Sequence, residues 1–286
     1  MFRSRQPLSA LRVANYNPRR IEAPALSRLK ASINRHGVAI PLIARDDGTL
    51  IAGHQCTLEG YAYQGEIVVY GVVDSIRSGR HRSCFARYQY PSRLPRSAQD
   101  RMIEAARRFL RHIAYDHAPF NVEFFWDPRT DAIRILEINT RLSKSHSPLF
   151  KMVDGDSQQR VAIDLALGRR PSLSRRRGRY PVAAKFMLRT FEDGIVERVP
   201  SAADIERLRR RFPEVLIWLM VEEGARLSHI AYQDSYSFEL AEIFLGAGSP
   251  SELLAKYCAA LELLPFRLGP ADIASFGRCP DRKSVV

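Results

Sequence analysis

Lysine is scarce in this sequence, and long apolar runs are missing from it. Six lysines stand among 44 basic residues, so nearly all of the positive charge comes from arginine. Arginine suits bidentate contacts with phosphate and carboxylate groups. A bias in codon usage explains the same excess, so the arginine content alone does not select a ligand.

Cysteine clusters and export signals are also lacking. The four cysteines are far apart, which predicts neither a zinc site nor a disulfide framework and favours a reducing cytoplasm. The first residues contain no continuous apolar segment, and no run approaches the length of a membrane span. We therefore expect a cytoplasmic protein without a membrane partner.

The remaining composition is that of an ordinary globular protein. Hydrophobic residues make up 45% and charged residues 26% of the 286 positions, which leaves room for one large domain or a few small ones. The net charge is +13. An excess of this sign favours an anionic partner such as nucleic acid, nucleotide or phosphometabolite, and it does not indicate a fold.

Several helices and strands are readable from periodicity and turn residues. Residues 8–54 predict a helix at 25–35 and a hairpin around Asp47–Gly48, and residues 56–90 predict further strands. A helix is expected over 97–113, with a capping box from Ser97 to Asp100. Its predicted buried face consists of Met102, Ala105, Phe109 and Ile113. The arginine-rich segment 169–181 indicates a solvated linker rather than a nucleic-acid patch.

The stretch "FNVEFFWDPRTDAIRILEINTRLSKSH", from Phe120 to His146, reads as two strands joined by a polar turn. Side chains alternate between the two faces of a strand. A turn at 128–131 therefore places Glu123 and Glu137 on the same face, opposite each other or offset by two residues. The same alternation assigns Ile135, Asn139 and Arg141 to the face of Glu137.

Two carboxylates in these positions require a compensating charge. Like charges facing each other destabilise a hairpin, and burying them without a partner is costly. Mg²⁺ prefers carboxylate oxygens, and Asn139 adds a neutral oxygen ligand to Glu123 and Glu137. Arg141 is then suited to hold a phosphate or carboxylate. The alternative is surface salt bridges to arginines such as Arg129 and Arg134, but a pattern of two glutamates, Asn139 and Arg141 within apolar strands favours the metal.

The hairpin "NVEFFWDPRTDAIRILEINTR" resembles the metal-binding segment of the ATP-grasp superfamily, of the biotin carboxylase and carbamoyl phosphate synthetase type. The resemblance implies that Glu123, Glu137 and Asn139 bind Mg²⁺ (or Mn²⁺) and ATP, with Arg141 as the catalytic residue at the reacting anion. It extends over about residues 50–268 and places Glu59 near the nucleotide. The implied reaction is attack of a carboxylate on the γ-phosphate of ATP, which gives an acylphosphate for capture by a nucleophile.

The first half of an ATP-grasp fold, with its nucleotide lysines and Gly-rich lid, is not readable before Glu59. No lysine occurs between Lys30 and Lys144. In its place, "YNPRRIEAPALSRLKASINRHGVAIPLIARDDGTLIAGH" resembles the N-terminal domain of ParB, of the ParB/sulfiredoxin fold. In that family an arginine-bearing loop binds a nucleotide phosphate, whereas this chain reads "GHQC" there, Gly53–Cys56.

The sequence thus predicts an α+β chain, a partial ATP-grasp fold (an antiparallel sheet with helices) preceded by a small ParB-like α/β unit. The expected segments are a ParB-like unit at 1–54, a nucleotide- and metal-binding half at 55–172, a small C-terminal domain at 173–270 and a tail at 271–286. The leading hypothesis is an ATP-grasp ligase, or its remnant, acting on a nucleotide and a small carboxylate, with an oligomeric partner as a possible source of the missing subdomain. The alternatives are a ParB-like partition module that binds nucleotide, or DNA through the N-terminal segment, and an inactive fusion.

Overall fold

The structure, a computed structural model, describes residues 54–77, 84–230 and 237–269. These residues belong to one compact unit that begins at His54. The expectations for the helix at 25–35, the hairpin around Asp47–Gly48, the ParB-like segment and the tail at 271–286 lie outside the described residues, apart from His54 itself. In the part of the chain that is described, no helix is long and apolar enough to cross a membrane.

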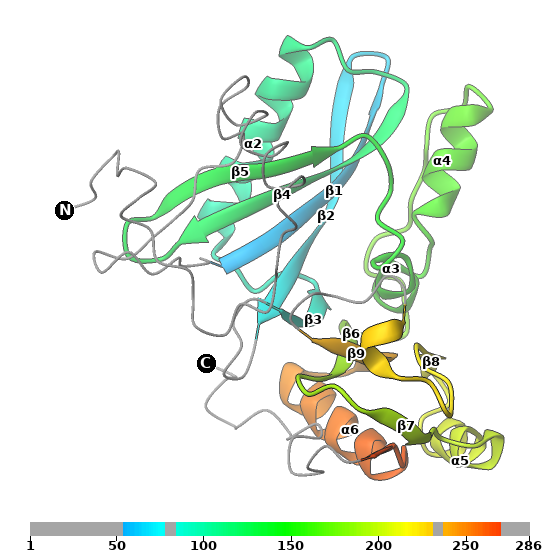
Figure 1. Cartoon of the computed structure of the whole chain (residues 1–286). Coiled ribbons are helices and arrows are strands. Elements are labelled where there is room, and N and C mark those ends of the chain that lie inside the picture. Colours follow the sequence, from blue (N-terminus) through cyan, green and yellow to red (C-terminus); the bar gives the residue numbers. More distant parts are fainter. Residues whose placement is uncertain (1–53, 78–83, 231–236, 270–286) are drawn as a thin grey trace, which may run out of the picture. The chain divides into compact units, whose positions relative to one another are not determined.

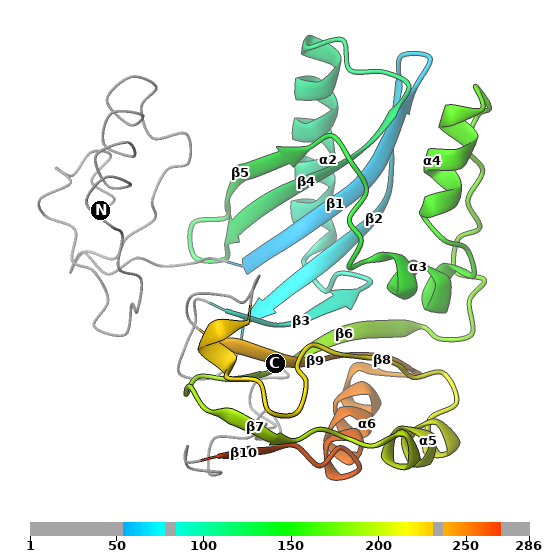
Figure 2. The same ribbon diagram turned by 45° about the vertical axis from the view of Figure 1, so that its right-hand side comes forward.

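An antiparallel sheet of eight strands, in the order β5-β4-β1-β2-β3-β6-β9-β8, runs through the unit (Figure 1, Figure 2). The strands are β1 (His54–Tyr63), β2 (Glu66–Arg77), β3 (Phe85–Tyr90), β4 (Ala118–Asp127), β5 (Ala132–Asn139), β6 (Val182–Thr190), β8 (Leu216–Leu219) and β9 (Phe238–Ala247). A smaller sheet pairs β7 (Ile195–Arg198) with β10 (Arg267–Gly269). The predicted antiparallel sheet is confirmed.

Helices cover both faces of the large sheet. They are α2 (Arg96–His112), α3 (Ser147–Asp154), α4 (Gln159–Ala166), α5 (Ala202–Arg211) and α6 (Pro250–Glu262), with a short 3₁₀ turn, η2 (Leu227–His229). Val72 and Val73 are neighbours on β2 and therefore point to opposite faces. Val72 belongs to the core under α2, whereas Val73 belongs to the core under α3, so these two helices lie on opposite sides of the sheet.

The predicted helix at 97–113 is present as α2, and Met102 of its expected face is buried, but the expected cap is wrong and so are Phe109 and Ile113. The residue before the helix is Pro95, and no side chain caps the first turn. Its buried side chains are Ala98, Met102, Ala106 and Leu110, whereas Phe109 and Ile113 are exposed. The buried row follows i, i+4 steps along the helix, and only packing against β2, β4 and β5 selects this row over its neighbour.

The β4–β5 hairpin has the predicted register, with Glu123 directly opposite Glu137. A β-bulge between Glu123 and Phe124 then pairs Phe124 with Ile135, which leaves Leu136 as the extra residue. The bulge reverses the alternation of faces, so Ile135 packs in the α2 core together with Ile138. The expectation that Ile135 shares the face of Glu137 is therefore wrong.

The six arginines of segment 169–181 are exposed, as expected for a solvated segment, but hydrogen bonds also hold its backbone against the sheet and α3. The hydroxyl of Tyr61 donates a hydrogen bond to the Pro171 carbonyl (3.1 Å), and that of Tyr63 donates to the Gly168 carbonyl (3.0 Å). The Gly178 amide donates to the Val153 carbonyl (2.9 Å). The expected domain boundary lies at residues 172–173. Strand β3, before it, pairs with β6, after it, so strands from both sides of the boundary belong to one sheet. That boundary stays a prediction.

Two of the cysteines that the structure describes, Cys56 and Cys84, are free and buried.

Candidate active site

Four polar side chains form two facing pairs on the β4–β5 hairpin. Glu123 lies opposite Glu137, and Asn121 lies opposite Asn139. The Asn139 amide nitrogen donates a hydrogen bond to Asn121 Oδ1 (3.0 Å), and the Asn121 amide nitrogen donates to the carbonyl of Arg141 (3.0 Å). Because these two bonds fix both amide groups, Asn139 keeps its carbonyl oxygen as an acceptor for another ligand.

Glu123 carries an electrostatic cost in this position. Burial raises the pKa of the Glu123 carboxyl group; the hydrogen bond from Gln55 opposes this rise, and the charge of Glu137 adds to it. The hydrogen bond joins Gln55 Nε2 to Glu123 Oε2 at 2.7 Å. Glu137 itself is exposed. A cation between the two carboxylates would neutralise the repulsion that the hairpin register creates.

Arg141 lies two residues beyond the end of β5. Its side chain is exposed, and its guanidinium donates only to the Leu142 carbonyl (3.3 Å) among the described residues. Its charge is one of the causes that lower the pKa of Glu123, although burial remains the larger effect. The structure therefore brings Glu123, Glu137 and Asn139 together and leaves Arg141 at their edge with most of its hydrogen-bonding capacity unused.

Glu59 lies on β1, directly opposite Asn121 on β4. Its side chain is fully buried, and its Oε1 atom is 2.7 Å from His146 Nδ1. The other carboxylate oxygen has no hydrogen-bond partner. Burial raises the pKa of Glu59, and the hydrogen bond with His146 opposes that rise. As it lies, Glu59 faces His146, the residue directly before the first turn of α3.

Two further polar residues, Lys185 and Glu242, lie near the loop that follows β5 and were not singled out in the sequence. Lys185 on β6 is buried, and its ammonium group forms an ion pair with Glu242 on β9 and a hydrogen bond to Ser145 Oγ (3.2 Å). Lysine was expected upstream of the glutamates, on the segment that carries nucleotide lysines in ATP-grasp proteins. Its isolation in the apolar run "VAAKFMLR" was the available signal.

The donor set of the hairpin fits a hard divalent cation. Two carboxylates and one amide oxygen are ligands that Mg²⁺ prefers, with its other positions left for water and phosphate. In the part of the chain that the structure describes, no group of three or more His, Cys, Asp or Glu residues is arranged to hold a metal ion. A metal at the hairpin would therefore depend on Asn139 and on a ligand such as a phosphate as well as on the two glutamates.

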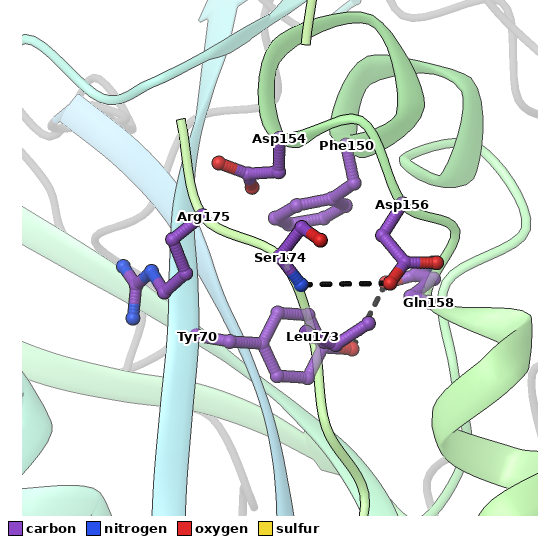
Figure 3. A pocket seen from close by; sticks show the side chains of 8 residues that line it. All are labelled: Tyr70, Phe150, Asp154, Asp156, Gln158, Leu173, Ser174 and Arg175. Atoms are coloured by element: carbon purple, nitrogen blue, oxygen red, sulfur yellow. Dashed lines mark hydrogen bonds between the residues drawn. The ribbon is translucent and has the colours of Figure 1, made fainter. Parts of the chain in front are cut away.

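A small pocket lies beside α3 (Figure 3), lined by Tyr70, Phe150, Asp154, Asp156, Gln158, Leu173, Ser174 and Arg175. The hydroxyl of Tyr70 donates to Gln158 Oε1 (3.1 Å), and Gln158 Nε2 donates to the Ser143 carbonyl. Asp154 accepts hydrogen bonds from the Tyr90 hydroxyl (2.7 Å) and the Arg176 amide (2.8 Å). The hydrogen bond from Gln158 to Ser143 ties the start of α4 to the loop that carries Arg141.

Comparison with known proteins finds a matching family model and solved structures with a similar fold. Residues 64–173 match the family model described as carbamoyl-phosphate synthase L chain, ATP binding domain. This segment contains the hairpin and its four polar side chains. The match covers less than half of the chain, and a comparison with curated proteins gives no significant match.

Solved structures share the fold at low sequence identity. Biotin carboxylase from Campylobacter jejuni, in its beta-gamma-ATP complex, has a TM-score of 0.55 and 17% identity over 85% of this chain and 52% of its own. L-amino acid ligase from Bacillus licheniformis has a TM-score of 0.59 and 15% identity over 77% of this chain and 55% of its own. The biotin carboxylase domain of Hydrogenobacter thermophilus 2-oxoglutarate carboxylase, solved with MgADP, ADP and bicarbonate, has a TM-score of 0.54 and 17% identity over 75% and 46%.

The described residues therefore form a partial ATP-grasp α+β fold. The chain spans about half the length of these solved proteins. The predicted ATP-grasp resemblance is confirmed at the level of the superfamily and its ATP-binding domain, whereas none of the comparisons supports the ParB-like segment.

Proposed function

We propose that this chain binds Mg²⁺ and ATP at the β4–β5 hairpin and acts as an ATP-dependent ligase on a small carboxylate substrate. The proposed ligands of the metal are Glu123, Glu137 and Asn139, and Arg141 holds the reacting anion. The observation that carries the proposal is the facing pair of carboxylates, Glu123 opposite Glu137, inside a segment that matches an ATP-binding domain.

Each residue of the proposed site would have a distinct role in binding. Glu123 and Glu137 supply negative charge, and the Asn139 oxygen completes the set because the Asn139 amide nitrogen is engaged by Asn121. Arg141 has free donors for a carboxylate or a phosphate oxygen. When bound, Mg²⁺ would neutralise the phosphate charge that develops during phosphoryl transfer. Glu59 takes a supporting role in this proposal, because it is buried against His146, at the end of the loop that follows β5.

The test is calorimetric titration of the full chain with ATP, once with Mg²⁺ and once with a chelator. We expect binding that requires the metal and that weakens by about tenfold or more in Glu137→Gln, since even the outer-shell partners of a metal site matter by 10–100-fold. The control is Glu104→Gln, which changes an exposed glutamate on α2. ATP affinity that is equal with and without Mg²⁺, or unchanged in Glu137→Gln, would contradict the proposal.

The acylphosphate step is tested separately with hydroxylamine. In the proposed reaction a carboxylate oxygen of the substrate attacks the γ-phosphorus, the bond from this phosphorus to the bridging oxygen breaks, and ADP leaves. Hydroxylamine would then capture the acylphosphate as a hydroxamate and release phosphate. A panel of small carboxylic acids and amino acids should yield a hydroxamate together with one ADP per product. ADP formation without any hydroxamate would leave ATP binding in place and exclude this route.

A partner that completes the nucleotide cleft is part of the proposal, because no Gly-rich loop precedes Glu59 and no lysine occurs between Lys30 and Lys144. A second copy of this chain or another chain would supply the missing lid. Size-exclusion chromatography with light scattering, with and without Mg-ATP, measures this directly. A monomer that turns over ATP by itself would refute the need for a partner.

A further inference from the structure

Gln55 on β1 links the candidate metal ligand Glu123 to an arginine on the neighbouring strand. Its side-chain amide is buried and hydrogen-bonded at both ends. Gln55 Nε2 donates to Glu123 Oε2 at 2.7 Å, and Gln55 Oε1 accepts from Arg77 Nη2 at 2.8 Å. The second oxygen of Glu123, Oε1, has no hydrogen-bond partner among the described residues.

Arg77 is itself held in place by aromatic rings. Its guanidinium carbon lies 4.3 Å from the centre of the Phe85 ring and 5.9 Å from that of Phe125. Contacts of this kind between a guanidinium and a ring face are attractive and restrict the side chain. The described residues contain no direct ion pair between Arg77 and Glu123, so the arginine acts on the carboxylate through the amide that lies between them.

This arrangement decides which way the Gln55 amide points. An amide has an oxygen and a nitrogen of nearly the same shape, and either end fits the same space. Arg77 has only donors, so it can form a hydrogen bond with the oxygen end of Gln55 but not with the nitrogen end. The nitrogen end then necessarily faces Glu123. Without Arg77 only the hydrogen bond to Glu123 would hold the amide in this orientation, and in the rotated state its oxygen would face the Glu123 carboxylate without a hydrogen bond.

We propose that Arg77 and Gln55 form a positioning relay that engages one oxygen of Glu123 and presents the other to the cation. Arg77 is a positioning residue here and does not touch the substrate. The effect of the relay on Mg²⁺ affinity rests on the proposed function. Its hydrogen bonds do not, because they are present in the chain without any ligand. The two parts of the inference are therefore measured separately.

The first measurement uses no ligand. The equilibrium constants for unfolding in urea are determined for the wild-type chain, Gln55→Leu, Arg77→Met and the double variant. Arg77→Met keeps an unbranched apolar side chain between the two phenylalanine rings. We expect the two sites to be coupled. The unfolding equilibrium constant of the double variant should be smaller, by about fivefold or more, than the value obtained by multiplying the effects of the two single variants. Coupling below about twofold would overturn the relay, whatever the chain binds.

The second measurement is the Mg²⁺ concentration that gives half-maximal ATP binding by the full chain. We expect it to rise about tenfold in Arg77→Met and in Gln55→Leu, and by no more in the double variant. Arg77→Lys restores a donor-only cation and should recover most of the affinity. Arg134→Met, which changes an exposed arginine on β5, is the matched control and should leave the value unchanged.

The outcomes separate the two claims. If the wild-type chain binds no Mg-ATP, the proposed function fails, while the unfolding cycle still decides whether the relay exists. If the wild-type chain binds Mg-ATP and Arg77→Met requires no more Mg²⁺ than the wild-type chain, the relay is refuted and the proposed function stands. If Arg77→Lys is as impaired as Arg77→Met, orientation of the amide by a donor-only group is refuted.

Discussion

His146→Ala should destabilise the chain strongly, because it removes the partner of a buried carboxyl group. His146 Nδ1 is 2.7 Å from Glu59 Oε1, and both side chains are almost completely buried. The second oxygen of Glu59 already lacks a hydrogen-bond partner. Removing one member of a buried pair leaves the other charge uncompensated and typically costs about 3–5 kcal/mol. We expect a loss of this size in the free energy of unfolding near neutral pH.

The dependence of this loss on pH follows from Glu59. Burial raises its pKa above the usual 4.5, and the hydrogen bond from His146 limits the rise. A carboxyl group with a raised pKa binds more protons in the folded state than in the unfolded state, so its contribution to stability is present at low pH and is lost as the pH rises through the folded-state pKa. Without His146 this pKa rises further. The cost of His146→Ala should therefore be largest near neutral pH and smallest at or below the usual pKa.

The assay is urea unfolding at a series of pH values between neutral pH and the usual glutamate pKa of 4.5. Glu59→Gln in the His146→Ala background should remove most of the added pH dependence, because the buried charge is gone. The control His112→Ala changes an exposed histidine at the end of α2 and should stay within about 0.5 kcal/mol of the wild-type chain. A loss below about 1 kcal/mol for His146→Ala, or a loss that is independent of pH, would refute this account of the pair.

Three further substitutions test other parts of the fold by urea unfolding. Gly60→Ala should cost about 1–3 kcal/mol, because a Cβ there would lie 2.5 Å from the carbonyl oxygen of Val68; an unchanged midpoint would contradict this. Arg87→Met should stabilise the chain by about 1 kcal/mol or more, since burial lowers the pKa of this guanidinium to about 10 and its Nε atom has no partner; a loss of stability would count against it. Ser201→Ala should cost about 1 kcal/mol by removing the capping box with Asp204, and an equally stable variant would show that the cap is dispensable.

The hairpin could be predicted from the sequence because its information is local. The turn and the alternation of side chains place Glu123 opposite Glu137 without knowledge of any other element. The bulge at Leu136 was not predictable in this way, because one extra residue in a strand leaves no mark in the hydrophobic pattern. Ile135 was consequently assigned to the wrong face.

Contacts between distant segments were beyond the reach of the sequence. Glu59 and His146 are 87 residues apart along the chain, and Lys185 and Glu242 are 57 residues apart. Periodicity identifies buried polar residues but does not identify their partners. The Gln55 amide is a further case: "GHQC" was interpreted as the end of a ParB-like loop, whereas Gln55 lies within β1 and contacts Glu123.

The most direct test of the proposed metal site is anomalous scattering from crystals of the full chain grown with Mn²⁺ and a non-hydrolysable ATP analogue. The account predicts a manganese peak at the carboxylates of Glu123 and Glu137, next to the Asn139 side chain, and the loss of this peak in Glu137→Gln. Nucleotide bound with no metal at these residues, at saturating Mn²⁺, would contradict the account.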